Sequence, residues 1–117
     1  MEPVGIDAVE VWTGKLKLDL PETFAPQKGE DPDKYRKGIG LVGSSFPDLY
    51  EDIVTMGANA AKRLMDRKGL TPEDIGRIDV ATESAFDNSK PVSTYIAGCL
   101  EQYFDGEFRH ANKGERK

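Results

Sequence analysis

The side chain best suited to proton transfer in this chain is that of Glu83, which follows a short apolar stretch. Within residues 76–82, Ile78 and Val80 are β-branched and favour a strand. A carboxylate at the end of a strand can act as a general acid or base when an apolar wall makes its ionisation costly, and Phe86 is the nearest candidate for that wall. Most such carboxylates are simply solvated, so position alone does not make Glu83 catalytic.

Two other reactive side chains, Cys99 and His110, are weaker candidates. Cys99 falls on one helical stripe with Tyr95, Ile96 and Tyr103, where we expect a thiol to pack as a small, inert apolar group. His110 lies in a segment without hydrophobic periodicity and has no sequence neighbour that suggests a catalytic dyad. Because no pair of His or Cys residues has the spacing of metal ligands, we expect no metal site.

A glycine-containing stretch, residues 38–40, lies beside the basic residues Lys34, Arg36 and Lys37. Backbone amides and positive charges of this kind can cradle a phosphate. However, the stretch neither follows a predicted strand nor opens a helix, so it does not fit a dinucleotide-binding fingerprint. The local pattern favours a solvated basic loop.

These candidates must be positioned by regular elements, and the sequence predicts an α/β layer. We expect strands at residues 5–12, 15–20 and 76–83. We expect one helix from its cap at Asp48 to Lys68, and a second helix across residues 92–103. Residues 22–45 are predicted to be an ordered but irregular loop with one helical turn at residues 31–35. Alternation of strands and helices predicts a parallel sheet, whose ligands gather beyond the carboxyl ends of its strands.

Capping signals define the expected ends of the helices. Asp48 with Glu51 three residues later is typical of a capping box, and Gly69 is typical of a helix C-terminus. Ser89 and Asn88 are expected to cap the second helix, with Pro91 in its first turn. Asp105-Gly106 is expected to end that helix, and Thr71–Asp74 to form a separate single turn.

Composition narrows the class of protein further. The chain has 117 residues, a formal net charge of −5 and a single cysteine, and its pI is about 4.9. An acidic balance disfavours nucleic-acid binding, and a single cysteine excludes an intramolecular disulfide framework. With no apolar run long enough to span a bilayer and no signal-peptide pattern, we expect no membrane association and a cytoplasmic location.

Several stretches, taken in order, resemble the start of the hydroxymethylglutaryl-CoA (HMG-CoA) synthases. Residues 76–84, together with Asp87 and Ser89-Lys90, carry the most specific part of this resemblance. The similarity is greatest to archaeal, haloarchaeal-like members of the family. Agreement extends to residues 4–10, to residues 31–35 with 38–40, and to residues 51–53.

The resemblance implies a thiolase-like fold, of which this chain would be an incomplete part of the N-terminal αβαβα half. It also implies condensation of acetyl-CoA with acetoacetyl-CoA to HMG-CoA in the mevalonate pathway, with CoA thioesters as substrates and no further cofactor. Glu83 matches the family's general acid/base. Asp31 and Pro32 match a loop that lines the substrate site, although proline departs from the family pattern there. The family generally forms homodimers.

In the family, a cysteine is acetylated and a histidine helps to position the second substrate, but neither Cys99 nor His110 matches those positions. Residues 1–117 are therefore expected to be the N-terminal part of the synthase domain, ending before the nucleophile and inactive alone. Two alternatives stay open at this point. One is another thiolase-superfamily condensing enzyme, such as a ketoacyl synthase, which would differ around Glu83. The other is a non-catalytic acyl-CoA-binding or scaffold domain, which would bind acetoacetyl-CoA without turnover.

Overall fold

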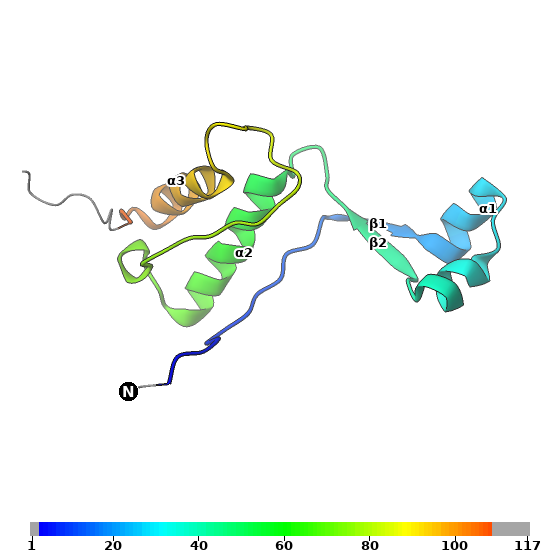
Figure 1. Ribbon diagram of the computed structural model, residues 1–117, viewed down its shortest axis with the longest axis horizontal. Helices are drawn as coiled ribbons and strands as arrows, with labels where there is room; N and C mark the ends of the chain where they lie inside the picture. The colour runs from blue at the N-terminus through cyan, green and yellow to red at the C-terminus, as the bar shows by residue number, and fades with distance from the viewer. Residues whose placement is uncertain (1–2, 109–117) are drawn as a thin grey trace, which may run out of the picture. The chain divides into compact units, whose positions relative to one another are not determined.

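The computed structural model describes residues 3–108, which divide into two compact bodies. We call the first the terminal body, because it comprises the residues up to Trp12 and those from Ile53 onward. The second, the inserted body, comprises Thr13–Asp52. Both are drawn in Figure 1.

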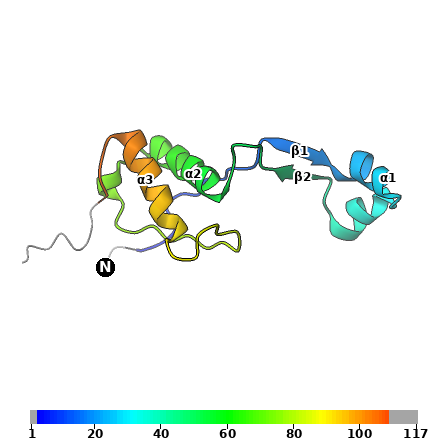
Figure 2. The same cartoon turned by 90° about the horizontal axis from the view of Figure 1, so that it is seen from above.

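The terminal body is built on two packed helices, α2 (Ile53–Lys68) and α3 (Val92–Phe104), which lie side by side in Figures 1 and 2. Helix α3 turns a stripe of every fourth residue inward, as the 3.6-residue period requires. Gly57 on α2 lets the helices approach, because a Cβ there would lie 2.6 Å from Cδ1 of Ile96. The buried core of this body consists of Val54, Met65, Val92, Ile96, Leu100 and Phe108.

The predicted ends of α2 are half right. Its C-terminus is confirmed, since Gly69 follows Lys68 with a left-handed φ of 66°. The predicted N-terminus at Asp48 is wrong, because α2 begins at Ile53. The Asp48 amide donates to the Glu51 carboxylate at 2.9 Å, and the Glu51 amide donates to the Asp48 carbonyl at 2.9 Å. The two residues thus close a turn of their own before the helix.

The first residues of the chain run along α2 in an extended form (Figure 1). Arg67 donates to the carbonyl of Val9 at 2.7 Å, and Arg63 donates to that of Val11 at 3.4 Å. Glu10 lies within 3.9 Å of Arg63 and 3.6 Å of Arg67. The strand predicted at residues 5–12 is therefore extended backbone held by arginine side chains, with no strand paired to it among the described residues.

Residues 75–82 are also extended, and their side chains alternate as in a strand. Ile78 and Val80 are half-buried against the helix core, whereas Asp79 and Ala81 are exposed. No neighbouring strand within residues 3–108 pairs with this segment, so the predicted parallel sheet is not formed there. Before it, the predicted turn at Thr71 is confirmed as η3 (Pro72–Asp74), closed by a capping box.

The inserted body contains the one sheet of the described chain, an antiparallel pair of β1 (Leu16–Asp19) and β2 (Gly43–Phe46) (Figure 2). Strand β1 lies within the strand predicted at residues 15–20. The expected irregular loop is instead largely helical, and Asp19 caps the first helical piece by accepting the Glu22 amide at 2.7 Å. The helical pieces are η1 (Leu20–Phe24), α1 (Ala25–Lys28) and η2 (Lys34–Ile39).

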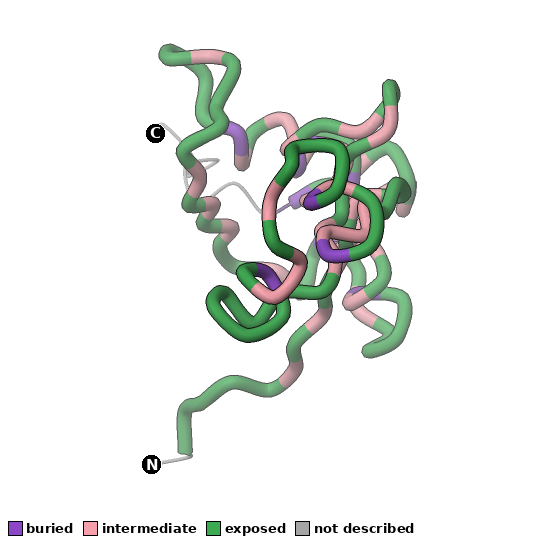
Figure 3. Tube along the Cα trace, turned by 90° about the vertical axis from the view of Figure 1, so that its right-hand side faces the viewer, coloured by how far each residue is buried: buried purple, intermediate pink, exposed green. Residues whose placement is uncertain are grey.

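Burial is confined to short stretches of each body, as the tube in Figure 3 shows. Several large apolar side chains are exposed, including Val4 at 99% and Ile6 at 87% in the terminal body, and Leu49 at 92% in the inserted body. Large apolar side chains are therefore exposed in both bodies. Among the described residues, no helix has the length and apolarity needed to cross a bilayer.

Candidate functional site

Glu83 lies where the extended segment of the terminal body ends and a loop begins. Because Ile78 and Val80 alternate into the helix core, the period of two directs Asp79 and Glu83 outward. Glu83 is exposed, and among residues 3–108 no hydrogen bond or ion pair engages its carboxylate. The Ser84 amide donates to Oγ1 of Thr82 at 3.0 Å, which bends the chain at Glu83.

The apolar wall expected beside Glu83 does not bury its carboxylate. Phe86 is 60% exposed, and its ring packs against the ring of Tyr95 on α3, with centroids 5.1 Å apart. Glu83 itself stays exposed to solvent. A surface hollow of about 320 Å³ in this body is lined by residues 75–78, Phe108 and side chains of α3, and Glu83 is not among its lining residues.

Asp87 organises the loop that follows Glu83. Its Oδ1 accepts the amides of Ser89 at 2.8 Å and Lys90 at 3.0 Å, and its Oδ2 accepts the hydroxyl of Tyr95 at 2.8 Å. The amides of Lys90 and Ser89, followed by the Tyr95 hydroxyl, lower the pKa of Asp87 because they stabilise its charged form. The Asp87 carboxylate thus accepts the hydrogen bonds that hold the loop in its conformation.

Tyr95 of α3 contacts this loop at three residues. Its hydrogen bond to the Asp87 carboxylate raises the pKa of the Tyr95 phenol, since a second negative charge there would be repelled. Nζ of Lys90 lies 4.0 Å from the centroid of the Tyr95 ring, in cation–π geometry. One aromatic side chain therefore touches Phe86, Asp87 and Lys90.

Asp31 and Pro32, the predicted substrate-loop residues, belong to the inserted body. Asp31 is exposed, and its Oδ1 accepts the Asp33 amide at 2.9 Å, while its carbonyl accepts the Lys34 amide at 3.1 Å. Pro32 is half-buried at the start of the helical piece that continues into η2. The two residues thus form the turn that opens η2.

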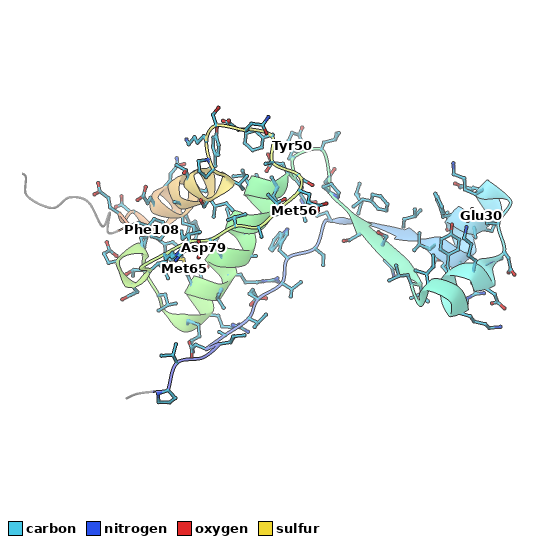
Figure 4. The ribbon with its side chains drawn as sticks, viewed as in Figure 1. Glu30, Tyr50, Met56, Met65, Asp79 and Phe108 are labelled. Atoms are coloured by element: carbon cyan, nitrogen blue, oxygen red, sulfur yellow. The ribbon has the colours of Figure 1, made fainter. Side chains whose placement is uncertain are left out.

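The basic residues of η2 are all paired with carboxylates. Lys34 lies 3.0 Å from Glu30, Lys37 lies 2.6 Å from Asp33, and Arg36 pairs with Glu22. Figure 4 labels Glu30 in this cluster. The buried Tyr35 donates its hydroxyl to Glu30, and this bond, followed by the bond from Lys34, lowers the Glu30 pKa. These pairings do not form an open phosphate cradle, and the segment is a helical piece rather than the predicted loop.

The interpretation of Cys99 as a packed core residue is wrong, because Cys99 is exposed. The inward residues of α3 are Val92, Ile96 and Leu100, at intervals of four, and Cys99 falls on the flank of that stripe. His110 lies outside the described residues. Among the residues that are described, no cluster of His, Cys, Asp or Glu can hold a metal ion.

Sequence reasoning missed the role of Tyr95, which it assigned to the apolar stripe of α3. It also expected Ser89 and Asn88 to cap α3, whereas the N-cap position is Pro91 and makes no side-chain cap. The available signal was an aspartate followed by Ser89 and Lys90, because aspartate commonly accepts the amides two and three residues ahead in a turn.

The fold of the described residues is similar to a solved structure of MvaS in complex with 3-hydroxy-3-methylglutaryl coenzyme A. The match has a TM-score of 0.78 and 36% sequence identity, and it covers 83% of this chain and 23% of that chain. The class is therefore a thiolase-like fold, represented here by part of a domain with mixed helix and strand.

A family model described as hydroxymethylglutaryl-coenzyme A synthase N terminal matches residues 1–109, and the chain belongs to this family. It is 85% identical over 117 residues to the hydroxymethylglutaryl-CoA synthase of Haloferax volcanii, covering 100% of this chain and 26% of the relative. It is 31% identical over 113 residues to the synthase of Archaeoglobus fulgidus, covering 94% of this chain and 33% of that relative. The chain thus spans about a quarter to a third of the length of these two relatives.

Proposed function

We propose that residues 1–117 form the N-terminal part of an enzyme that condenses acetyl-CoA with acetoacetyl-CoA to HMG-CoA, in the mevalonate pathway. The observation that carries this proposal is the 85% identity to the Haloferax volcanii synthase across the whole chain. The solved neighbour, whose ligand is 3-hydroxy-3-methylglutaryl coenzyme A, supports it.

In the proposed reaction, Glu83 is the general acid/base. It removes a methyl proton from an acetyl group held as a thioester on a cysteine, and the resulting carbanion attacks the ketone carbon of acetoacetyl-CoA, whose oxygen takes up a proton. Water then hydrolyses the thioester to the cysteine, which frees the thiol and releases HMG-CoA. The exposed carboxylate at the end of an extended segment is accessible to an acyl group delivered from another part of the enzyme. The cysteine nucleophile and the histidine of the family are expected outside the stretch that this chain supplies.

Asp31 and Pro32 are proposed to line the substrate site from the inserted body. Asp31 is suited to a fixed position because two backbone amides, those of Asp33 and Lys34, bond to it within one turn. We further propose a cytoplasmic homodimer that takes CoA thioesters as its substrates and needs no additional cofactor.

The proposal is tested by replacing Glu83 with Gln in the full-length protein that carries these residues. The expected result is a fall in kcat of about 10²–10⁴-fold, the usual contribution of a general acid or base, while acetylation of the cysteine persists. Acetyl-enzyme is measured by intact mass after exposure to acetyl-CoA, and condensation by loss of acetoacetyl-CoA absorbance.

The matched control is Asp79→Asn, which removes an exposed carboxylate of the same extended segment that pairs with Arg77 at 2.8 Å. Its kcat should stay close to that of the wild type. Equal losses in both variants would overturn the assignment of Glu83. A wild-type protein that binds acetoacetyl-CoA without turnover would favour the acyl-CoA-binding alternative.

A further inference from the structure

The loop between Glu83 and α3 has no regular backbone structure of its own. Residues 83–90 contain neither helix nor strand, so side-chain contacts and a few hydrogen bonds must define their conformation. Two of those bonds, from the amides of Ser89 and Lys90 to Asp87, are local and close a turn within the loop. They do not fix where that turn lies relative to the helices.

Tyr95 supplies the connection from this turn to α3. Its hydroxyl donates to Oδ2 of Asp87 at 2.8 Å, across eight residues of sequence. Its ring contacts the ring of Phe86, the residue before Asp87, and the ammonium group of Lys90, three residues after Asp87. Tyr95 is half-buried and directly precedes the core residue Ile96, so its own position is set by helix packing.

We propose that Tyr95 is a positioning residue for Glu83: it holds the Asp87-centred loop against α3 and thereby fixes the approach of the Glu83 carboxylate to the acyl group. Tyr95 touches no substrate in this role and acts through Asp87 and Phe86. The inference rests on the proposed function for its catalytic consequence, but the structural link between Tyr95 and the loop does not depend on it.

The catalytic test is Tyr95→Phe in the full-length protein, which removes the hydroxyl and keeps the ring. Misplacement of a catalytic group by a fraction of an ångström should lower kcat by about tenfold or more, with the KM for acetyl-CoA nearly unchanged. The control is Tyr103→Phe on the same helix, whose ring centroid lies 4.2 Å from Nζ of Lys62 and whose change should leave kcat unchanged.

A second measurement separates this inference from the proposed reaction. Hydrogen–deuterium exchange of residues 83–90 should become several-fold faster in Tyr95→Phe and not in Tyr103→Phe, whether or not the protein condenses acyl groups. Faster exchange without any wild-type turnover would leave the positioning link standing and refute the proposed function. Unchanged exchange, or a kcat loss that only follows the loss of folded protein by circular dichroism, would overturn the role of Tyr95.

Discussion

Asp87 and Tyr95 form a pair in which each group alters the titration of the other. The amide and hydroxyl donors hold the Asp87 pKa below its ordinary 3.8, and the Asp87 carboxylate holds the Tyr95 pKa above its ordinary 10.0. A lowered carboxyl pKa contributes stability above the unfolded value that is lost as pH falls through the folded one. A raised phenol pKa contributes stability below pH 10.0 that is lost as pH rises through the folded value.

Replacing Asp87 with Asn should therefore lower the pKa of Tyr95 toward 10.0, because the neutral amide no longer repels the phenolate. The titration can be followed by NMR of the tyrosine ring in wild-type and variant protein. Tyr50, which is 88% exposed, serves as the internal reference. A Tyr95 titration that is identical in both proteins would show that the hydrogen bond to Asp87 is absent in solution.

Sequence alone placed Glu83 correctly at the end of an extended apolar segment, since alternation over Ile78 and Val80 is a local property. The contact between Asp87 and Tyr95 escaped it, because that contact depends on how the loop returns to the helix. Cys99 was misassigned for a related reason. A helical stripe defined by intervals of three and four residues is wider than the face of α3 that α2 covers. Only Val92, Ile96 and Leu100 are buried on α3.

At the scale of elements, α2 and α3 were predicted, whereas the helical pieces between Leu20 and Ile39 and the absence of a parallel sheet among the described residues were not. Helix α3 runs over Val92–Phe104 and ends at Asp105, as its periodicity and end signal indicated. A helix closes its own hydrogen bonds, whereas an extended segment becomes a strand only with a partner beside it. Residues 5–12 and 76–83 have the composition of strands, but none of the described segments pairs with them.

The packing of α2 on α3 predicts unequal effects for two adjacent residues of α3. Leu100 is 2% exposed in the core, so Leu100→Ala should destabilise the chain by about 2–4 kcal/mol. Cys99→Ala changes an exposed neighbour and should alter stability by less than about 0.5 kcal/mol. Urea denaturation of the full-length protein, followed by helical circular dichroism, measures both, and similar midpoints for the two variants would refute the packing.

At the scale of the molecule, large apolar side chains are exposed in both bodies. They include Val4, Ile6, Val9 and Val11 in the terminal body, and Leu49 in the inserted body. Exposed apolar residues in such numbers are typical of surface that another part of a protein covers. The described residues therefore have the surface expected of part of a larger thiolase-like domain.

The 117-residue chain on its own should consequently bind a hydrophobic dye strongly, self-associate at micromolar concentrations and lack synthase activity. Dye fluorescence and light scattering measure the first two, and an acetoacetyl-CoA depletion assay measures the third. A monodisperse monomer with dye fluorescence no higher than that of a folded control protein would contradict this expectation. So would measurable turnover, because no side chain in this chain matches the family nucleophile.

The arginine contacts along α2 have a consequence for how the protein emerges from the ribosome. Val9 and Val11 meet Arg67 and Arg63, which are 58 and 52 residues away in sequence. At about 5–20 residues per second, the opening segment waits roughly 3–12 seconds for these partners to be translated. During that interval the inserted body, whose contacts lie within Thr13–Asp52, can form first. The beginning of the chain is thus placed after the inserted body, although it is translated before it.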